Sequence, residues 1–320
     1  MRILVAMPVE ERHKALLKEA AQKAEFIFCP SAQVTEELAQ SVDIIIGNVK
    51  PQKIAGTDRL RWMQLNSAGT DGYLEPGVLP EGTLLTNATG AYGLAISEHM
   101  LGMVLELKKK LYLYHQNQLA ECWKDEGKVT SIFGSVTLVI GLGDIGSEFA
   151  SRMKALGSYV IGIRRTKAEK PDYVDELRQM DGLEDCLKRA DVVALSLPGT
   201  KETYRLMDTN RLACMKKSAV LINVGRGTAV DTEALCDALE QGRIAGAGLD
   251  VTDPEPLPPG HRLWKAPNVV ITPHISGLYH LQETHERIVG IAAENLAAFL
   301  EGRPMRSLVD RSTGYRAVKQ

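Results

Sequence analysis

The stretch that decides the fold reads Leu138-Val-Ile-Gly141-Leu-Gly-Asp-Ile-Gly146. Three apolar residues lead directly into a glycine-rich turn, a helical pattern continues to Leu156, and a second apolar run follows at Tyr159–Ile163. This order of strand, GxGxxG turn, helix and strand is typical of a βαβ unit that binds a dinucleotide. The glycines permit a tight turn and close approach of a pyrophosphate, whose charge a helix N-terminus favours.

The residues of this turn are the first candidate site. We expect contacts to a dinucleotide from Gly141, Gly143, Asp144, Ile145 and Gly146. Asp144 is an unfavourable charge beside a phosphate, so we expect it to cap the helix that begins there by accepting free N–H groups. The alternative for the whole stretch is an ordinary strand–helix turn without a ligand, because glycine is common at turns.

The end of the next strand distinguishes the two nicotinamide dinucleotides. Folds that bind NAD usually carry an acid about 20 residues beyond the turn, where it binds the ribose 2′-hydroxyl. Here that position is Arg164, followed by Arg165, Thr166 and Lys167. Guanidinium groups and a hydroxyl bind a 2′-phosphate through charge-assisted hydrogen bonds. We therefore predict that NADP(H) is preferred and that NAD(H) is possible. The alternative is a solvated basic loop.

Strand and helix patterns alternate on both sides of this unit. Apolar, β-rich runs occur at Ile3–Ala6, Phe26–Phe28, Asp43–Ile46, Trp62–Leu65, Leu84–Thr86, Val192–Leu197, Val220–Val224, Gly246–Val251 and Val269–Thr272. Helical patterns such as Glu10–Ala21 separate them. This alternation predicts an α/β protein with two Rossmann-like, doubly wound parallel sheets.

Two long helical patterns suggest where the domains meet. One runs from about Ala91 to Trp123, and its part from Leu94 to Leu107 is apolar on nearly every side, which predicts burial. The other spans about Leu281–Leu300. We predict a dinucleotide-binding domain at residues 100–284, inserted into a substrate domain made of residues 1–99 and 285–320.

Composition restricts the class of protein. A length of 320 residues suits two domains, and 44% hydrophobic with 24% charged residues excludes a disordered chain. A net charge of -2 gives no general attraction to nucleic acid or anionic membranes, and no apolar run is long enough to span a bilayer. The five cysteines have no metal-type or disulfide-type spacing, so we expect no metal site. The N-terminus lacks a signal-peptide pattern, so we expect a reduced, cytoplasmic protein.

Three segments that follow predicted strands carry groups suited to proton transfer and substrate binding. They contain Arg226, Glu255 and His274. Ligands of open parallel sheets bind outside the carboxyl ends of the strands, so all three residues are expected near the glycine turn. An arginine clamps a carboxylate, a histidine exchanges a proton near neutral pH, and a neighbouring carboxylate orients the histidine ring.

Each of these residues also has a simpler interpretation. Arg226 is then a surface arginine paired with Asp231, Glu255 a solvated residue between prolines, and His274 a hydrogen-bonded histidine at a strand end. Their occurrence at three consecutive strand ends beside a dinucleotide turn favours a shared site.

With these segments identified, the sequence resembles the D-isomer-specific 2-hydroxyacid dehydrogenases, which include glyoxylate/hydroxypyruvate reductases and phosphoglycerate dehydrogenases. The resemblance covers nearly the whole chain. It rests on Asn66-Ser-Ala-Gly-Thr-Asp71, Ile96-Ser-Glu-His99, Gly141–Gly146, Asn223-Val-Gly-Arg226-Gly, Asp250, Asp253-Pro-Glu255-Pro and Thr272-Pro-His274. The resemblance implies that Arg226, Glu255 and His274 are the catalytic residues.

The resemblance also implies further roles. Asp250 corresponds to the aspartate that binds the nicotinamide carboxamide, and the N–H groups of Ala68 and Gly69 to those that hold the substrate carboxylate. Further cofactor contacts are implied for Leu197, Pro198, Val224, Gly225 and Gly277. The family further implies a homodimer and an active site in a cleft between two Rossmann-like domains.

Two departures bear on cofactor and substrate. Arg164 replaces the ribose aspartate of NAD-dependent members, and Tyr92 stands where many members have a small or amide residue. We expect Tyr92 to border the substrate cleft, the alternative being a core tyrosine at a helix start. From a length of 320 residues we expect no regulatory domain of the kind found in many phosphoglycerate dehydrogenases.

We therefore expect an NAD(P)H-dependent enzyme that reduces a small 2-oxoacid, similar to glyoxylate or hydroxypyruvate, to a D-2-hydroxy acid with His274 as general acid. One alternative is an NAD-dependent phosphoglycerate dehydrogenase, which Arg164 disfavours. Another is a non-catalytic dinucleotide sensor that binds partner proteins, because a fold does not fix a function.

Overall fold

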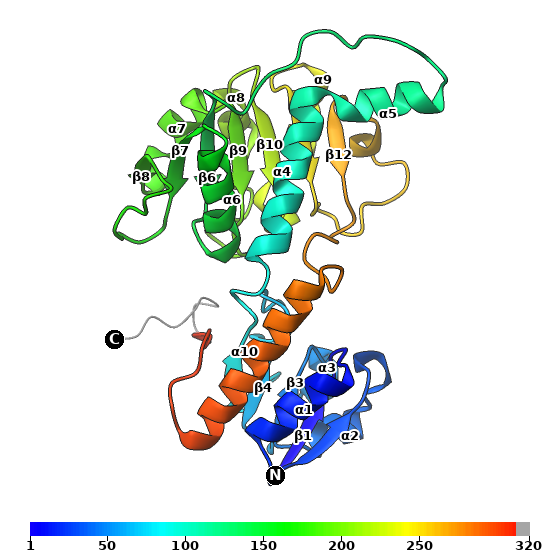
Figure 1. Ribbon diagram of the computed structural model, residues 1–320, viewed down its shortest axis with the longest axis vertical. Coiled ribbons are helices and arrows are strands. Elements are labelled where there is room, and N and C mark those ends of the chain that lie inside the picture. The colour runs from blue at the N-terminus through cyan, green and yellow to red at the C-terminus, as the bar shows by residue number, and fades with distance from the viewer. Residues whose placement is uncertain (312–320) are drawn as a thin grey trace. The chain divides into compact units, whose positions relative to one another are not determined.

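The chain forms two compact units in a computed structural model that describes residues 1–311 (Figure 1). Unit 1 contains Met1–Tyr92 and the chain from Tyr279 onward, and unit 2 contains Gly93–Leu278. The chain changes unit a few residues earlier than the limits expected from the sequence, at both places. The reason is that helix α4 (Gly93–Lys109) belongs wholly to unit 2, whereas α10 (Gln282–Glu301) belongs wholly to unit 1.

Unit 1 is built on a five-stranded parallel sheet in the order β2-β1-β3-β4-β5. The strands are β1 (Arg2–Val5), β2 (Glu25–Phe28), β3 (Ile44–Ile46), β4 (Trp62–Gln64) and β5 (Leu84–Thr86). The helices are α1 (Glu11–Ala20), α2 (Glu36–Gln40), α3 (Pro51–Ile54) and α10. α10 packs beside α1, and its Phe299 stacks on the buried Trp62 at 5.4 Å between ring centroids.

Unit 2 is built on a seven-stranded parallel sheet in the order β12-β11-β10-β9-β6-β7-β8. The strands are β6 (Val136–Ile140), β7 (Tyr159–Ile163), β8 (Glu176–Arg178), β9 (Val192–Leu195), β10 (Val220–Asn223), β11 (Gly246–Leu249) and β12 (Val269–Ile271). The central strands β9 and β10 are buried along their whole length, as expected for a parallel sheet covered on both faces. The α/β class and the doubly wound parallel sheets expected from the sequence are confirmed.

The helices of unit 2 correct one expectation. They are α4, α5 (Leu111–Leu119), α6 (Asp144–Ala155), α7 (Leu183–Arg189), α8 (Thr209–Cys214) and α9 (Thr232–Glu240). The single helix expected from Ala91 to Trp123 is wrong, because the chain turns at Lys110, whose φ of 58° is left-handed, and α5 ends at Leu119. The sequence has no glycine or proline there to signal the break.

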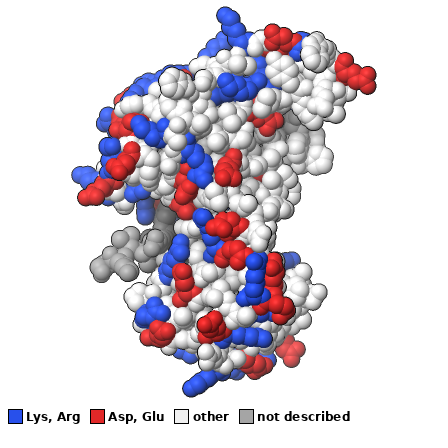
Figure 2. Space-filling view, in the orientation of Figure 1, with Lys and Arg blue, Asp and Glu red and all other residues white. Residues whose placement is uncertain are grey.

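The surface carries charges of both signs. On the face shown in Figure 2, basic and acidic side chains are interspersed over both units. No helix within residues 1–311 is both long and apolar enough to cross a membrane. Within the same range, no cluster of His, Cys, Asp and Glu side chains is arranged to hold a metal ion.

Candidate active site

The glycine turn lies at the point where the strand order of unit 2 reverses. β6 leads into it, and β6 is flanked by β7 on one side and β9 on the other. The chain therefore leaves neighbouring strands in opposite directions at this edge. In open α/β sheets this reversal creates the crevice in which ligands bind.

The three glycines of the turn have different functions. Gly141 has a φ of +97°, and a Cβ there would lie 2.8 Å from the carbonyl oxygen of Ser196. A Cβ on Gly146 would overlap the carbonyl oxygen of Gly141. A Cβ on Gly143, in contrast, would have no atom within 4 Å. A pyrophosphate site requires a tight turn, a helix packed closely against that turn, and a glycine beside which there is free space. The three glycines meet these requirements, so the turn fits a dinucleotide.

The acidic residue of the turn caps a helix other than the expected one. Oδ2 of Asp144 accepts a hydrogen bond from the N–H of Gly93 at 2.9 Å, which is the first residue of α4. α4 and α6 pack side by side (Figure 1), so the start of α6 can reach the start of α4. Asp144 thus ties α4 to the turn, and Ile145 follows as the second residue of α6.

Arg164 is held against the turn. It follows β7 directly, and its Nη2 donates to the carbonyl oxygen of Leu142 at 3.1 Å. Its Nε is buried and has no acceptor among residues 1–311. Arg165 and Thr166, which follow it, are exposed. The end of β7 therefore presents cationic and hydroxyl donors close to the glycine turn.

Arg226 lies between Gly225 and Gly227, two positions where neighbouring backbone atoms leave no space for a side chain. A Cβ on Gly225 would lie 2.6 Å from the carbonyl oxygen of Leu197, and one on Gly227 would overlap the carbonyl oxygen of Thr252. The Asn223 side chain accepts from the N–H of Gly225 at 3.1 Å and donates to the carbonyl oxygen of Arg226 at 3.0 Å. The loop after β10 is thus joined to the loops after β9 and β11. These loops carry the candidate residues Leu197, Pro198 and Val224.

The simpler interpretation of Arg226 involved Asp231 as its partner. The Asp231 carboxylate instead contacts Arg205 at 3.2 Å and accepts from the N–H of Ala234 at 3.2 Å, which caps α9. Nη1 of Arg226 donates to the carbonyl oxygen of Gly225 at 2.8 Å.

His274 and Glu255 form a hydrogen-bonded pair. Nδ1 of His274 lies 2.6 Å from Oε1 of Glu255, and the two side chains are 49% and 41% exposed. His274 has a φ of 52°, in the left-handed region, and its N–H donates to the carbonyl oxygens of Asp250 and Thr272. Such conformations cost about 1–3 kcal/mol and concentrate at functional sites. An Nδ1–H donated to Glu255 leaves Nε2 as the ring atom that can transfer a proton.

Asp250 organises the loop that carries His274. The residue is 1% exposed and follows β11. Its Oδ1 accepts from the Thr272 hydroxyl at 2.6 Å and from the N–H of Ile275 at 3.0 Å. Its Oδ2 accepts from the N–H and the hydroxyl of Ser276 at 3.1 and 2.5 Å. These four contacts use the acceptor sites of the carboxylate. The loop continues to Gly277, and His99 of α4 contacts Thr272 at 3.0 Å.

In unit 1, side chains from neighbouring strand ends hold the loop of Ala68 and Gly69. Asn48, after β3, accepts through Oδ1 from the N–H of Asn66 at 3.0 Å, while its own N–H donates to Asn66 Oδ1 at 2.6 Å. Asn87, after β5, donates to the carbonyl oxygen of Ala68 at 2.7 Å. These asparagines make the loop rigid from both sides.

The carbonyl groups of this loop are engaged, whereas two of its amides are available. The carbonyl oxygens of Ser67 and Gly69 accept from the N–H of Ala88 and the Ser67 hydroxyl. No hydrogen bond to any residue within 1–311 engages the N–H of Ala68 or of Gly69. Adjacent free amides in a fixed loop suit an anionic ligand.

Tyr92 supports the same loop. It is 8% exposed, and its hydroxyl donates to the carbonyl oxygen of Asn66. Burial raises the pKa of this hydroxyl, so it stays protonated and able to donate. Tyr92 thus contacts the loop of Ala68 and Gly69 from within the core of unit 1.

Several supporting residues were not recognised from the sequence. Thr272 and Ser276 bind Asp250, and Asn48 and Asn87 hold the loop of Ala68. Thr272, Asn48 and Asn87 lie within two residues of a strand end, so a search of strand ends for hydroxyl and amide side chains would have found these three, whereas Ser276 lies further along the loop after β12.

The comparisons with known proteins agree on one family. The model for the D-isomer specific 2-hydroxyacid dehydrogenase NAD-binding domain matches residues 101–276. A glyoxylate reductase from Thermofilum pendens is 32% identical over 273 residues, which cover 84% of this chain and 80% of that protein.

Solved structures give the same result. A D-isomer specific 2-hydroxyacid dehydrogenase family protein from Aeromonas salmonicida is similar with a TM-score of 0.85 and 30% identity, covering 97% of this chain and 99% of that one. An NADPH-dependent glyoxylate/hydroxypyruvate reductase from Sinorhizobium meliloti, in complex with NADP and sulfate, has a TM-score of 0.81 and 25% identity, covering 98% and 99%.

Proposed function

Because this chain belongs to the D-isomer-specific 2-hydroxyacid dehydrogenases, enzymes that act on CH–OH groups with a nicotinamide dinucleotide, we propose that it reduces a small 2-oxoacid to the D-2-hydroxy acid. Substrates similar to glyoxylate or hydroxypyruvate suit the proposal best, because relatives that reduce them match most of the chain. The observation that carries the proposal is the 2.6 Å contact between His274 and Glu255.

When bound, the nicotinamide dinucleotide supplies the hydride. The residues that would hold it are the glycine turn, the donors at Arg164, Arg165 and Thr166, and the loops with Leu197, Pro198, Val224, Gly225 and Gly277. The fit of the turn supports this, since Gly143 leaves open space beside the N-terminus of α6.

The chain's own residues bind the substrate and supply the proton. Arg226 and the N–H groups of Ala68 and Gly69 hold the substrate carboxylate, and Arg226 polarises the keto oxygen. His274 donates a proton from Nε2 to that oxygen, while Glu255 keeps Nδ1–H directed toward itself.

Two buried residues act by positioning. Asp250 fixes the His274 loop through its four contacts and acts on cofactor and substrate through that loop. Tyr92 fixes the carbonyl group of Asn66 and thereby the amides of Ala68 and Gly69. Its effect on substrate choice is therefore indirect.

We propose that NADPH is preferred to NADH. Nη2 of Arg164 is held at the turn by Leu142, and its buried Nε lacks an acceptor among the described residues, so a 2′-phosphate would satisfy it. Charge-assisted hydrogen bonds contribute about 1.5–3 kcal/mol where they are well formed. Because Arg165 and Thr166 are exposed, we expect a total preference of roughly 1–3 kcal/mol, or about 5- to 150-fold.

A steady-state panel tests the function. The purified protein is assayed with glyoxylate, hydroxypyruvate, pyruvate and 3-phosphohydroxypyruvate, each with NADPH and with NADH. We expect the highest kcat/KM for one of the first two acids with NADPH. A preference for 3-phosphohydroxypyruvate with NADH would favour a phosphoglycerate dehydrogenase, and dinucleotide binding without turnover would favour a sensor.

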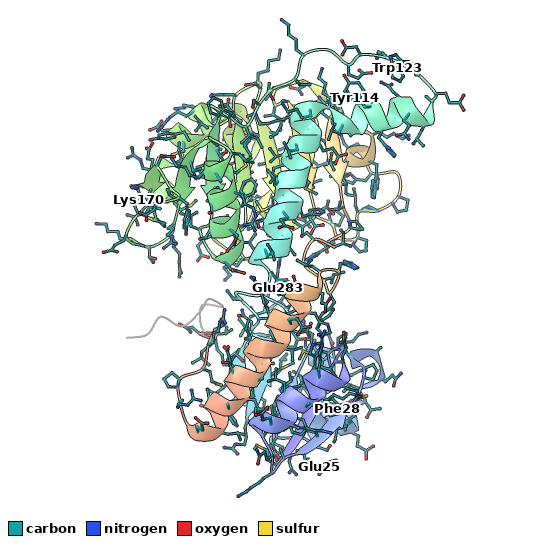
Figure 3. The ribbon with its side chains drawn as sticks, in the orientation of Figure 1. Glu25, Phe28, Tyr114, Trp123, Lys170 and Glu283 are labelled. Carbon is teal, nitrogen blue, oxygen red and sulfur yellow. The ribbon has the colours of Figure 1, made fainter. Side chains whose placement is uncertain are left out.

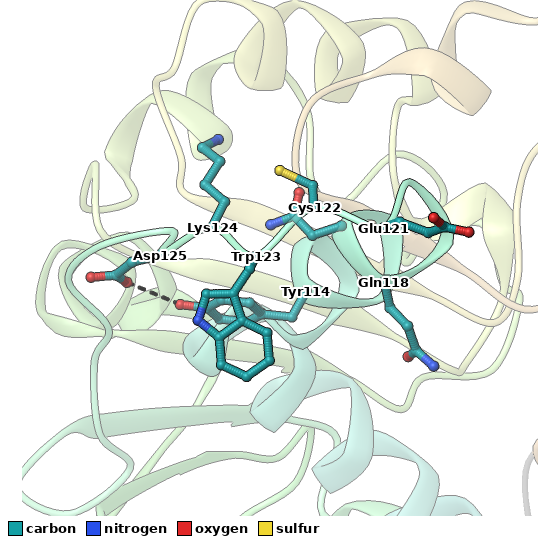
Figure 4. A pocket seen from close by; sticks show the side chains of 8 residues that line it. Tyr114, Gln118, Glu121, Cys122, Trp123, Lys124 and Asp125 are labelled. Carbon is teal, nitrogen blue, oxygen red and sulfur yellow. Dashed lines mark hydrogen bonds between the residues drawn. The ribbon is translucent and has the colours of Figure 1, made fainter.

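We also propose that the protein is a homodimer, with the segment around α5 in the interface. Trp123 is fully exposed and Leu119 is 74% exposed. Tyr114 and Trp123 lie on this segment (Figure 3) and line an open cavity of about 610 Å³. Figure 4 shows the Tyr114 hydroxyl directed at Asp125, 3.2 Å away. Exposed apolar side chains such as Leu119, together with aromatic side chains beside a hollow, are typical of protein interfaces.

Sedimentation velocity at several concentrations tests the dimer. We expect Trp123→Asp to shift the protein toward the monomer. Leu16→Asp, at an exposed position on α1, serves as the matched control and should leave the dimer intact. A monomeric wild type, or a dimer that Trp123→Asp leaves unchanged, would reject this interface. We keep the cytoplasmic location as a proposal, because five free thiols are typical of a reducing compartment.

A further inference from the structure

A second cavity lies at the opposite edge of the sheet in unit 2. Its volume is about 180 Å³, and its lining includes Lys108, Thr130, Ser131, Ser135, Asp191 and Ser218. Asp191 and Ser218 stand just before β9 and β10, and Ser135 just before β6. The cavity is therefore at the amino ends of three adjacent strands, whereas the glycine turn is at a carboxyl end.

Lys108 brings a largely buried side chain with a terminal ammonium group to this cavity. The residue is 6% exposed and lies in the last turn of α4. Its ammonium makes no hydrogen bond or ion pair with any residue in the described part of the chain. Burial lowers the pKa of Lys108, and the nearby Asp191 counteracts this effect. An ammonium group with three N–H donors and no acceptor among residues 1–311 can bind an anionic partner.

Asp191 does not fill that role, because its carboxylate is already engaged. Oδ1 lies 3.0 Å from Nζ of Lys216, and Oδ2 accepts from the N–H of Val136 at 2.9 Å. The Asp191 carboxylate thus forms an ion pair with Lys216 and also lies near Lys108. The half-buried Lys109 adds a further repulsive charge toward Lys108. The net charge of the three lysines and Asp191 is therefore positive.

Hydroxyl groups complete the set of donors. The side chains of Thr130 and Ser218 make no hydrogen bond to a residue within the described range. Oγ of Ser131 accepts from the N–H of Phe133 at 3.2 Å, which leaves its O–H free to donate. Ser135, in contrast, donates to the carbonyl oxygen of Ile132 at 2.6 Å. One ammonium and three hydroxyls therefore face a single small space.

We propose that this cavity is a binding site for a small oxyanion, with Lys108 as its counter-charge. The shared chemistry is a phosphate or carboxylate group that accepts hydrogen bonds from Lys108, Thr130, Ser131 and Ser218. A volume of about 180 Å³ corresponds to about six water molecules, which suits a small ion and is below the ~300–1,000 Å³ of drug-sized ligand sites. The site lies away from the glycine turn, so both are occupied independently.

Titration calorimetry with the dinucleotide site saturated tests this proposal. Inorganic phosphate and malonate are titrated separately into the wild type and into Lys108→Met, at constant ionic strength. We expect millimolar binding that weakens at least about tenfold in Lys108→Met, the usual loss for a hydrogen bond to a charged group. Lys108→Arg should retain binding, and kcat without the anion should be unchanged. Tighter binding of phosphate assigns a phosphate site, and tighter binding of malonate a carboxylate site.

A second variant guards against loss of folding. Thr130 and Ser218 are exposed, so Thr130→Val/Ser218→Ala should fold normally and weaken binding by about 3- to 10-fold. The proposal is overturned if neither anion binds the saturated wild type. It is also overturned if both the Lys108→Met protein and the double variant bind as tightly as the wild type.

Discussion

The Nδ1 atom of His274 lies 2.6 Å from Oε1 of Glu255, although the two residues belong to different loops. His274 follows β12, and Glu255 lies in the connection after β11, so their contact forms only when the sheet edge is assembled. The contact engages Nδ1 and leaves Nε2 as the ring nitrogen that can exchange a proton.

Glu255→Ala tests the contribution of this contact. We expect kcat for 2-oxoacid reduction to fall by about 10- to 100-fold, because a hydrogen bond to a charged group contributes about 1.5–3 kcal/mol. Glu255→Gln should lose less, since an amide oxygen still accepts from Nδ1–H. Steady-state kinetics check this, with NADPH affinity as the control. Wild-type kcat in the Ala variant would remove Glu255 from the mechanism.

Arg164→Asp tests cofactor choice. The carboxylate would accept the ribose hydroxyl of NADH and repel the 2′-phosphate, so we expect the preference to reverse. The wild-type preference for NADPH should also shrink at high salt, because the interaction is partly screened. Lys167→Asp is the matched control, since it makes the same change of charge at an exposed neighbour. Equal kcat/KM for both cofactors in the wild type at low salt would contradict the role of Arg164.

Tyr92→Phe tests whether the Tyr92 hydroxyl supports the loop of Ala68 and Gly69. Loss of the hydroxyl removes the hydrogen bond to Asn66 and should raise KM for the 2-oxoacid about 2- to 10-fold, with NADPH binding unchanged. Tyr73→Phe is the control, because the Tyr73 hydroxyl makes a similar buried bond to the Val49 carbonyl at 2.9 Å. If both variants change KM equally, Tyr92 has only a general structural role.

Glu176→Gln tests a pH-dependent contribution to stability. The Glu176 carboxylate accepts two hydrogen bonds from Arg189 and one from Arg178, which lower its pKa to about 2. A folded-state pKa below the unfolded value stabilises the protein above about pH 4.5, and this contribution is lost as pH falls toward 2. We expect Glu176→Gln to cost about 1–2 kcal/mol at pH 7. Thermal unfolding should show the difference disappearing near pH 2; a constant difference would contradict it.

The sequence predicted strands correctly where the local residue pattern agrees with the position of the strand in the folded sheet. The central strands of both sheets are nearly continuous apolar runs, so their positions were readable. β8 was missed because Glu176–Arg178 is a short edge strand with two charged residues and no apolar pattern. The break at Lys110 was missed because the helical pattern continues through it.

The candidate site was readable for a related reason. Parallel strands bring their carboxyl ends to one edge, so Arg226, Glu255 and His274 could be grouped from strand order alone. The distance between His274 and Glu255, and the four contacts of Asp250, depend on loop conformation, which no local pattern encodes. The same holds for Asp144, whose partner Gly93 is distant in sequence.

The most direct test of the central claim is the turnover of His274→Asn with glyoxylate and NADPH, measured as NADPH oxidation beside the wild type. The asparagine keeps a polar side chain of similar reach and tolerates the left-handed φ of this position, but it cannot donate a proton to the keto oxygen. We predict that kcat falls by about 10²–10⁴ while NADPH binding is retained. Near-normal turnover in a folded His274→Asn protein would contradict the assignment of His274 as the general acid.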